Sequence, residues 1–345
     1  VGSEMCIRDR PVSELFELTG RHIDDMCIIR SMQADVPNHE PSLMLMNCGE
    51  NTLVRPSMGS WLTYGLGTEN QNLPGFVAMS PGGHPIKGPD NWRSAFLPGI
   101  YEGAFVNTEH KTVDKLLENI RNPRLDLDRQ RQQVDLLQAL NRRHLDARHG
   151  DSELEARIAA YELAFRMQTE APGLMDISSE PQHIRDLYGL DNGTTAGFGR
   201  QCLLARRMVE SGVRHTLLVH GVQITNMSWD DHGDVKGGMI RHSSEVDRPV
   251  AGLLADLKQR GLLDETLVVW ASEMGRTPYI QQGNGPPGPK PGRDHNQNAL
   301  VMWMAGGNVK GGASAGETDE FGLRAREEPL PVSYTHLRAH ETDSY

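Results

Sequence analysis

The chain has 345 residues, enough to bury the core of one large domain or of two modest ones. It carries 46 acidic residues against 35 basic ones, a formal net charge of -11, and such a surface repels a phosphate backbone, which excludes nucleic acid as the expected partner. The four cysteines form no C-x-x-C pair and no run of about 18 apolar residues occurs, so the sequence predicts neither a zinc knuckle nor a transmembrane segment.

The two ends of the chain differ from the rest of the sequence. Residues 1–10, VGSEMCIRDR, and residues 331–345, PVSYTHLRAHETDSY, fit neither a helical nor a strand period. Both resemble translated sequencing adapters, so we expect both to be non-native and disordered or loosely packed, with ordinary frayed termini as the alternative. A single domain is then expected over residues 11–330, and functional residues of the parent protein can lie beyond it.

The first half of the chain predicts strands and loops followed by a helical insertion. The apolar run MCIIRSM at 26–32 predicts a strand, and Pro56 and Ser57 precede an apolar stretch in the manner of a helix start. Residues 73–100, rich in Gly and Pro, indicate strand and loop. Residues 113–170 carry Leu and Ala at helical spacing among charged residues. They predict two or three amphipathic helices that form a cap or lid beside the sheet.

The last third shows the clearest alternation of strand and helix. Residues 199–212 predict a helix that Gly212 ends, and residues 213–221 predict a strand. A second helix, which Gly261 ends, is predicted by apolar residues on one face: Val246, Val250, Leu253, Leu254 and Leu257. TLVVW at 266–270 and ALVMWM at 299–304 predict buried parallel strands. The expected fold class is therefore α/β, a mostly parallel sheet flanked by helices, with the helical insertion beside it.

Polar side chains collect in three clusters next to these strands. Carboxylates and imidazoles are ligands that Zn, Mn, Mg or Ca accept, so the clusters predict a divalent-metal site at the carboxyl edge of the sheet. The expected ligands are Asp230, Asp231, His232, Glu273, Asp294 and His295. An alternative needs no metal. In it, Asp230 or Asp231 caps the next helix. Glu273 pairs with Arg276, and Asp294 forms an Asx-turn.

A family resemblance rests on five strings of the sequence. They are NHEPSLMLMNCG, RPSMGSWLTYGLGTENQNLPGF, WDDHGD, DRPVAGLLADLKQRGLLDETLVVWASEMGRTP and GRDHNQNALVMWMAGGNVKGG. These strings closely resemble the sulfatase-like family known as domain of unknown function 1501, and the resemblance covers nearly everything between the two ends. It implies an alkaline-phosphatase-like fold, often in exported proteins, so we expect the parent protein to be periplasmic or extracellular.

The resemblance also implies roles for single residues. Glu273 in WASEMG takes the place of a metal-binding carboxylate, whereas Met274 replaces the second ligand, and methionine binds hard cations poorly. Asp230 and His232 resemble the Asp and His pair of the phosphatases, and His295 resembles their late metal histidine. The first-strand aspartate of the superfamily would lie upstream of the expected domain.

His39 has the sharpest expected role. The nucleophilic Cys of sulfatases lies in C-x-P-S-R, and a Gly follows the Pro by eight residues, a spacing that Pro41 and Gly49 keep here. The counterpart of the Cys is then His39, whose imidazole can attack phosphorus or bind a metal but cannot become formylglycine. We therefore expect His39 beside Glu273 and His295. The alternative is that His39 fills a turn between strand and helix.

These residues together predict a metal-dependent hydrolase of phosphate or sulfate esters, with an anionic small molecule or glycan ester as substrate and a divalent metal as cofactor. His39 and Arg276 are the expected catalytic residues, and Arg276 and Arg293 are expected to bind the tetrahedral oxyanion bidentately. The alternative function is a catalytically degenerate relative that binds a ligand or partner outside the cytoplasm. Met274 and the loss of the usual nucleophile favour that alternative.

Overall fold

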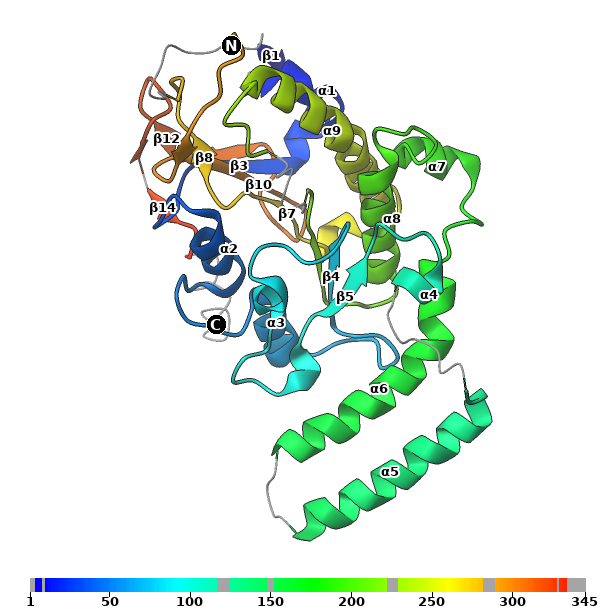
Figure 1. The fold of residues 1–345 in the computed structure, drawn as a ribbon. Helices are drawn as coiled ribbons and strands as arrows, with labels where there is room; N and C mark the ends of the chain where they lie inside the picture. Colours follow the sequence, from blue (N-terminus) through cyan, green and yellow to red (C-terminus); the bar gives the residue numbers. More distant parts are fainter. Residues whose placement is uncertain are drawn as a thin grey trace.

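Two separate β-sheets with helices around them form the body of the protein (Figure 1). The structure is a computed structural model, and it describes residues 4–7, 10–116, 124–147, 152–221, 229–281, 289–327 and 329–333. None of the helices in these ranges is both long enough and apolar enough to cross a membrane.

The larger sheet is mixed. Its strand β3, Met26–Gln33, pairs antiparallel with β10, Leu300–Ala305, and β10 pairs antiparallel with β7, Val268–Trp270. On the other side, β11, Ala313–Ala315, and β14, Leu330–Pro331, run parallel to β3. The sheet therefore has the order β11-β3-β10-β7, with β14 also paired to β3.

The smaller sheet is parallel throughout. Strand β4, Phe76–Ser80, lies between β5, Ala104–Asn107, and β6, His215–Leu218. All five residues of β4 are buried, as expected for the central strand of a sheet covered on both faces. The carboxyl ends of the three strands meet at one edge.

Two long helices pack against each other beside the sheets (Figure 1). They are α8, Ala196–Glu210, and α9, Val235–Gln259. α9 begins after Asp234, whose side chain accepts a hydrogen bond of 3.2 Å from the N–H of Gly237. The remaining α-helices are α1 (Glu17–Gly20), α2 (His39–Cys48), α3 (Met58–Leu66), α4 (Val113–Leu116), α5 (Leu127–Ala147), α6 (Ser152–Met175) and α7 (Gln182–Tyr188).

Short elements complete the fold. Three two-stranded antiparallel ribbons are described: β1 (Glu4–Ile7) with β2 (Arg10–Ser13), β8 (Gly275–Arg276) with β9 (His295–Asn296), and β12 (Glu317–Thr318) with β13 (Ala325–Glu327). Single 3-10 turns lie at Glu14–Phe16, Ile23–Asp25, Gly88–Trp92, Gly99–Tyr101 and Leu263–Glu265.

The helices α5 and α6 form a hairpin that extends away from the body (Figure 1). Arg131 on α5 joins the two helices through an ion pair of 2.8 Å with Glu162 on α6. Together with α4 they occupy the expected insertion at 113–170, except that α6 runs on to Met175.

The expectation of one mostly parallel sheet is wrong in the region that follows α9. The structure is α/β and partly parallel, but β7 and β10 run antiparallel. Parallel neighbours need a crossover connection, usually a helix. The described part of the segment between β7 and β10 contains no helix and instead turns through the β8 and β9 ribbon, which returns the chain in the opposite direction.

Parts of both terminal segments belong to the described structure. Glu4–Ile7 forms the strand β1, and Val332, just after β14, is buried at 4 % exposure and donates its N–H to the carbonyl of Gln33 at 2.8 Å. Val332 is therefore well packed, contrary to the expectation for this segment, whereas its neighbours 331 and 333 are half-buried. Residues 1–3 and 334–345 lie outside the described part of the chain, as do the side chains before residue 12.

The main hydrophobic core lies between α9, α8 and the sheets. The predicted apolar face of α9 is confirmed, because Val246, Val250, Leu254 and Leu257 are all buried and Leu253 packs against the same cluster. Trp270 and Trp303 face each other across β7 and β10 with their rings stacked 6.2 Å apart. Burial of this kind stabilises the fold in proportion to the apolar area removed from water.

The side chain of Leu254 is fully buried, with 0 % exposure. We expect Leu254→Ala to destabilise the protein by about 2–5 kcal/mol, because the truncation leaves a cavity where the side chain was. The matched control is Leu136→Ala on α5, where the side chain is 62 % exposed and the change should stay within about 0.5 kcal/mol. Urea unfolding of the three proteins measures both values. Equal losses in the two variants would contradict the assignment of Leu254 to the main core.

Candidate metal centre

Segments far apart in the sequence meet at the carboxylate of Asp230. His39 is the first residue of α2, directly after the loop that follows β3. Glu273 comes shortly after β7, and His295 begins β9. His39 and Glu273 are 234 residues apart in the chain, yet their side chains are in contact. The ring of His39 also lies 4.5 Å from that of His295. The structure therefore brings His39 next to both Glu273 and His295, as predicted.

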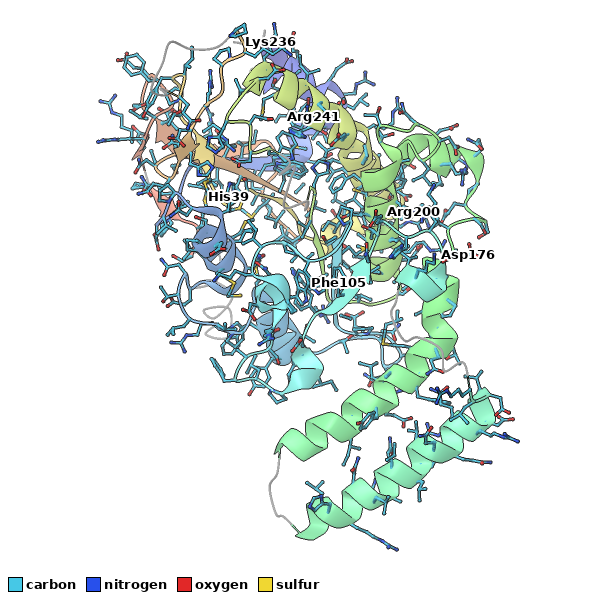
Figure 2. All side chains as sticks on the ribbon, viewed as in Figure 1. His39, Phe105, Asp176, Arg200, Lys236 and Arg241 are labelled. Carbon is cyan, nitrogen blue, oxygen red and sulfur yellow. The ribbon has the colours of Figure 1, made fainter. Side chains whose placement is uncertain are left out.

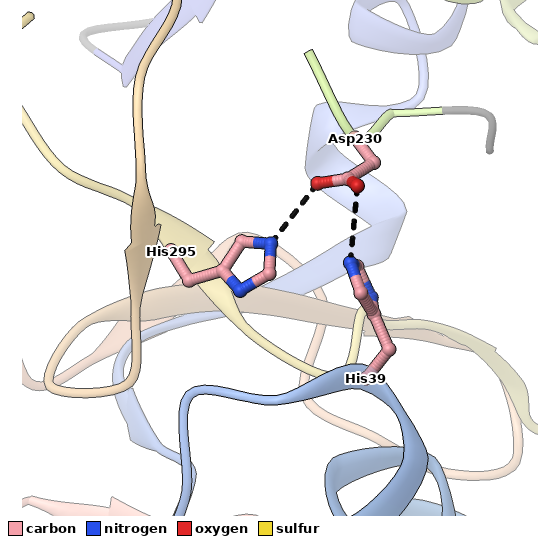
Figure 3. A group of neighbouring side chains, drawn as sticks. All are labelled: His39, Asp230 and His295. Atoms are coloured by element: carbon pink, nitrogen blue, oxygen red, sulfur yellow. Dashed lines mark hydrogen bonds and ion pairs between the residues drawn. The ribbon is translucent and has the colours of Figure 1, made fainter. Parts of the chain in front are cut away.

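Imidazoles contact both oxygens of the Asp230 carboxylate (Figure 3). The Nε2 atom of His39 lies 3.3 Å from Oδ2, and the Nε2 atom of His295 lies 3.0 Å from Oδ1. His232 is more exposed and brings its Nε2 to 3.0 Å from the same Oδ1. These separations equal those between neighbouring ligand atoms that each lie about 2.0–2.2 Å from a shared metal ion.

The other ring nitrogen of each histidine is held by an acceptor. The bonds join His39 Nδ1 to Glu273 Oε1 (2.9 Å), His295 Nδ1 to the carbonyl of Pro37 (2.6 Å) and His232 Nδ1 to Gln281 Oε1 (2.7 Å). A histidine that donates through Nδ1 keeps the lone pair of Nε2 available, and metal-binding histidines are usually oriented by such a partner. All three Nε2 atoms therefore face Asp230 in the orientation that a cation requires.

The donor set fits a divalent cation. The Nε2 atom of His39 is buried and makes no hydrogen bond of good geometry among the described residues. Ligand atoms of His39, Asp230 and His295 all lie within 4.8 Å of one another. A second group of the same kind consists of His232, Asp294 and His295. Two imidazoles with one carboxylate form a donor set suited to Zn or Mn.

Arg276 holds Asp230 in place. Its guanidinium donates to the Asp230 carboxylate, to the carbonyl of Trp229 at 2.9 Å and to the carbonyl of Arg293 at 3.0 Å. Because three of its five N–H donors are used by protein acceptors, Arg276 positions Asp230, and two donors remain for the oxyanion that the sequence predicted as its partner. The alternative was an ion pair between Glu273 and Arg276. Among the described residues, Arg276 contacts Asp230 instead, and Glu273 contacts His39.

Asp231 lies apart from this cluster, contrary to expectation. Its side chain, 9 % exposed, points toward α9, where it lies 3.6 Å from Arg241 and 3.5 Å from His242. A Cβ atom on Gly238 would lie 2.1 Å from the carboxylate of Asp231, so only glycine permits this approach. Asp231 therefore contacts the first turns of α9, and the helix cap that the alternative gave to Asp230 or Asp231 is supplied by Asp234.

Two further expected ligands take peripheral positions. Glu273 approaches the cluster through the Nδ1 of His39, so it orients a candidate ligand and lies behind it. Asp294 is 53 % exposed, accepts the backbone N–H of His295 at 2.8 Å and lies 3.9 Å from His232 Nδ1. The bond of Asp294 goes to the next residue, whereas an Asx-turn would bond the N–H two positions on, and its carboxylate stays within reach of the second group.

Neighbouring groups shift the pKa values of His39, Asp230 and Glu273. The hydrogen bond to Glu273 raises the pKa of His39, against the opposing effect of burial. Burial by itself would raise the pKa of Asp230, but hydrogen bonds from Arg276 and His295 lower it well below its usual range. The pKa of Glu273 is likewise lowered by His39 against a large burial effect. Both carboxylates are therefore ionised at neutral pH.

Some residues of the site gave no signal in the sequence. The carbonyl of Pro37 and the side chain of Gln281 orient histidines, but a backbone oxygen and a single loop glutamine match no motif. Trp229 has a left-handed backbone, φ 69°, which is rare for a large side chain. Its indole N–H donates to Nδ1 of His220 at 3.0 Å.

The sequence of the chain matches one known protein family. A family model described as "Protein of unknown function (DUF1501)" matches residues 6–341. The match includes every residue of the candidate centre and also parts of both terminal segments. No curated protein matches the chain.

We expect the imidazole of His39 in the metal-free protein to titrate above pH 6.5, its ordinary value, and Glu273→Gln to lower that pKa because the anionic acceptor is lost. A raised histidine pKa contributes stability that is fully present below about pH 6.5 and disappears as the pH rises through the folded-state value. The stability difference between wild type and variant should therefore shrink at high pH.

Imidazole NMR, with the His39 signal identified by its absence in His39→Ala, measures the titration, and urea unfolding at several pH values measures the stability. His183, exposed on α7, supplies an internal reference whose signal should not move in Glu273→Gln. A His39 pKa that is the same in wild type and variant would show that the bond to Glu273 does not form in solution.

Proposed function

The chain belongs to the DUF1501 family, and from the geometry around Asp230 we propose that it is a metal-dependent hydrolase of phosphate or sulfate esters. The observation that carries the proposal is the arrangement of three imidazoles. His39, His232 and His295 all direct Nε2 to one carboxylate, while each Nδ1 is held by an acceptor. A group of histidines that merely paired with Asp230 would not need three separate orienting partners.

We propose His39, Asp230 and His295 as the primary ligands of one divalent cation, Zn, Mn, Mg or Ca, and His232 with Asp294 as ligands of a second position that shares His295. When bound, the cation supplies polarisation of the ester oxygen and lowers the pKa of a coordinated water. Since Nε2 of His39 faces the ligand atoms, we assign this residue to metal binding and not to nucleophilic attack.

The remaining residues orient these ligands and bind the anion. Glu273 holds the Nδ1 proton of His39, and Arg276 keeps the Asp230 carboxylate ionised and fixed. Arg293, half-buried and next to Asp294, is the proposed partner of the anionic ester group, because guanidinium binds tetrahedral oxyanions bidentately. The proposed substrate class is an anionic small molecule or glycan ester.

The same proposal includes relatedness and location. The positions of Asp230, His232 and His295 support a relation to sulfatases and alkaline phosphatases, with an alkaline-phosphatase-like fold. A periplasmic or extracellular location of the parent protein follows from that relation.

A second candidate function, a non-catalytic binding protein, is favoured by two observations. Arg276 already donates to Asp230 and two carbonyl groups, which leaves it fewer N–H groups for an anion. Met274, at the position of a second ligand in the resemblance, is buried at 7 % exposure and offers only a thioether. A protein of this kind would bind metal without turning over esters.

We expect the protein to bind at least one divalent ion and to hydrolyse p-nitrophenyl phosphate or p-nitrophenyl sulfate. His39→Ala should lower the metal content by the ion of the primary position and abolish turnover, because the two primary ligands that remain are too few to hold that ion. Glu273→Gln should weaken metal affinity by about 10–100-fold, the usual loss when the partner of a metal-binding histidine is changed.

Metal content by mass spectrometry, after dialysis against each of the four ions, and a rate assay measure these effects. His183→Ala is the matched control, since it removes an exposed imidazole on α7. Metal binding without turnover would favour the binding protein, and unchanged metal content in His39→Ala would exclude the proposed centre.

A further inference from the structure

Helix α5 forms the outer layer of the hairpin. In Figure 1 it lies on the far side of α6 from the two sheets, and α6 is its main neighbour among the described elements. The C-terminal half of α6 is anchored in the body, where Ala171 and Met175 pack in a hydrophobic cluster with Leu204 of α8. Side chains also project from α5 on the side away from α6 (Figure 2). The described part of the chain leaves that side of α5 uncovered.

The seam between α5 and α6 is largely polar. Arg131 and Gln138 of α5 both donate to the carboxylate of Glu162, at 2.8 Å and 2.6 Å, and Gln138 is buried. The guanidinium of Arg131 also lies over the ring of Phe165, 5.0 Å from its centroid. Among the described side chains of α5, the buried apolar one is Val134. Most apolar side chains of α5 therefore do not hold the hairpin together.

Three leucines lie on the outer face of α5 instead. Leu136, Leu137 and Leu140 are all exposed. At about 3.6 residues per turn, they lie within about 100° of one another around the helix axis, and their common direction is well away from Val134 and Gln138 in the seam. A helix on a protein surface normally turns its apolar stripe toward the core and its polar residues toward water. The reverse arrangement in α5 indicates that a further layer covers the leucines.

Charged side chains lie at the two ends of α5 and are rare in its middle. Among the exposed residues at 132–140, the only charge is that of Asp135, which is paired within its own helix. The N-terminal end carries charges of both signs that balance, whereas the C-terminal end carries Arg142 and Arg143. An uncharged centre with charged residues at its rim is the composition of a protein–protein interface.

A second copy of α5 matches this face in shape and in charge. A two-fold pair uses the same patch on both chains, so leucines meet leucines. In an antiparallel pair, the basic end of one helix lies beside the balanced end of the other, and the helix dipoles oppose. In a parallel pair, Arg142 and Arg143 would lie beside their own copies and repel them. Two hairpins joined in the antiparallel way form a four-helix arrangement with the leucines inside.

The size of the face sets the strength of the contact. α5 has 21 residues, and only the residues on its outer side take part. Such an interface lies at or below the low end of the range for specific complexes, about 1,200 Å² in total. A membrane is a poorer occupant, because three leucines offer little apolar area for insertion and a chain with net charge -11 is repelled by anionic lipid.

We propose that the outer face of α5 binds the same face of a second copy of this chain, in an antiparallel two-fold pair centred on Leu136, Leu137 and Leu140. The dissociation constant is in the micromolar range, as expected for an interface of this size. The pairing requires neither a metal ion nor turnover, so it is independent of the proposed hydrolase reaction.

Sedimentation equilibrium in the presence of a chelator tests the pairing. Wild type should be largely monomeric at about 1 µM chain and largely dimeric at about 100 µM. Leu136→Glu/Leu140→Glu should weaken the dimer by about a hundredfold or more, because two buried contacts are lost and two charges enter the interface. Glutamate favours a helix about as well as leucine does, so circular dichroism should show an unchanged fold. Leu137→Glu, on the flank of the face, provides a second variant.

The matched control is Leu53→Glu/Leu66→Glu on the loop before α3 and on the last residue of α3. Its two leucines are 56 % and 61 % exposed, against 62 % and 53 % for Leu136 and Leu140. The control should dimerise as wild type does. The urea comparison that uses Leu136→Ala is made at chain concentrations below the dissociation constant, where the protein is monomeric.

Four results would overturn the proposal. The first is that wild type stays monomeric up to about 100 µM. The second is that Leu136→Glu/Leu140→Glu and Leu137→Glu dimerise as wild type does. The third is that the control loses the dimer to the same degree, which would place the contact at α3.

The fourth result concerns orientation. Oxidation of Arg143→Cys to a disulfide-linked dimer that wild type does not form would show a parallel pair. Binding of monomeric wild type to phosphatidylcholine vesicles, lost in Leu136→Glu/Leu140→Glu, would make the face a membrane contact and belongs with the first result. Failure of the hydrolase proposal would leave the dimer of wild type and its loss in the α5 variants unchanged.

Discussion

The charge of Asp230 is the constraint on which the candidate centre depends. A partly buried carboxylate is unfavourable unless other groups compensate it. In this protein the guanidinium of Arg276 compensates the charge, and the Nε2 atoms of His39, His232 and His295 lie within 3.3 Å of the carboxylate oxygens, where a cation would lie between them. Because these groups come from distant segments, the carboxylate ties α2, the loop before α9 and the β8 and β9 ribbon to one point.

Trp229 connects the candidate centre to the carboxyl edge of the parallel sheet. Its carbonyl accepts a hydrogen bond from Arg276 beside Asp230, and its indole N–H donates to His220, just after β6. His220 accepts through Nδ1 and lies near Glu245 through Nε2, and burial holds its pKa at about 4, so the bond to Trp229 persists at neutral pH.

Much of the fold could be predicted from the sequence where the periodicity of apolar residues was strong. The face of α9 from Val246 to Leu257 is buried as predicted, because a helical repeat of this length has one stable orientation against a core. The direction of β10 relative to β7 could not be predicted. An apolar strand can pair in either direction. The direction here is set by the connection between β7 and β10, whose described part turns back without a helix.

The candidate centre, like the fold, could be predicted only in part. The sequence by itself determined which donor groups were available, since carboxylates and imidazoles at strand ends are recognisable as residue types: His39, Asp230, Glu273 and His295. Only the tertiary structure decided how they act. Asp230 faces the histidines while Asp231 faces α9, Glu273 lies behind His39, and Arg276 is held by protein acceptors. These differences depend on the direction in which each side chain points and on the residues that pack around it. Both depend on segments far apart in the sequence, so neither can be read from the residues near each position.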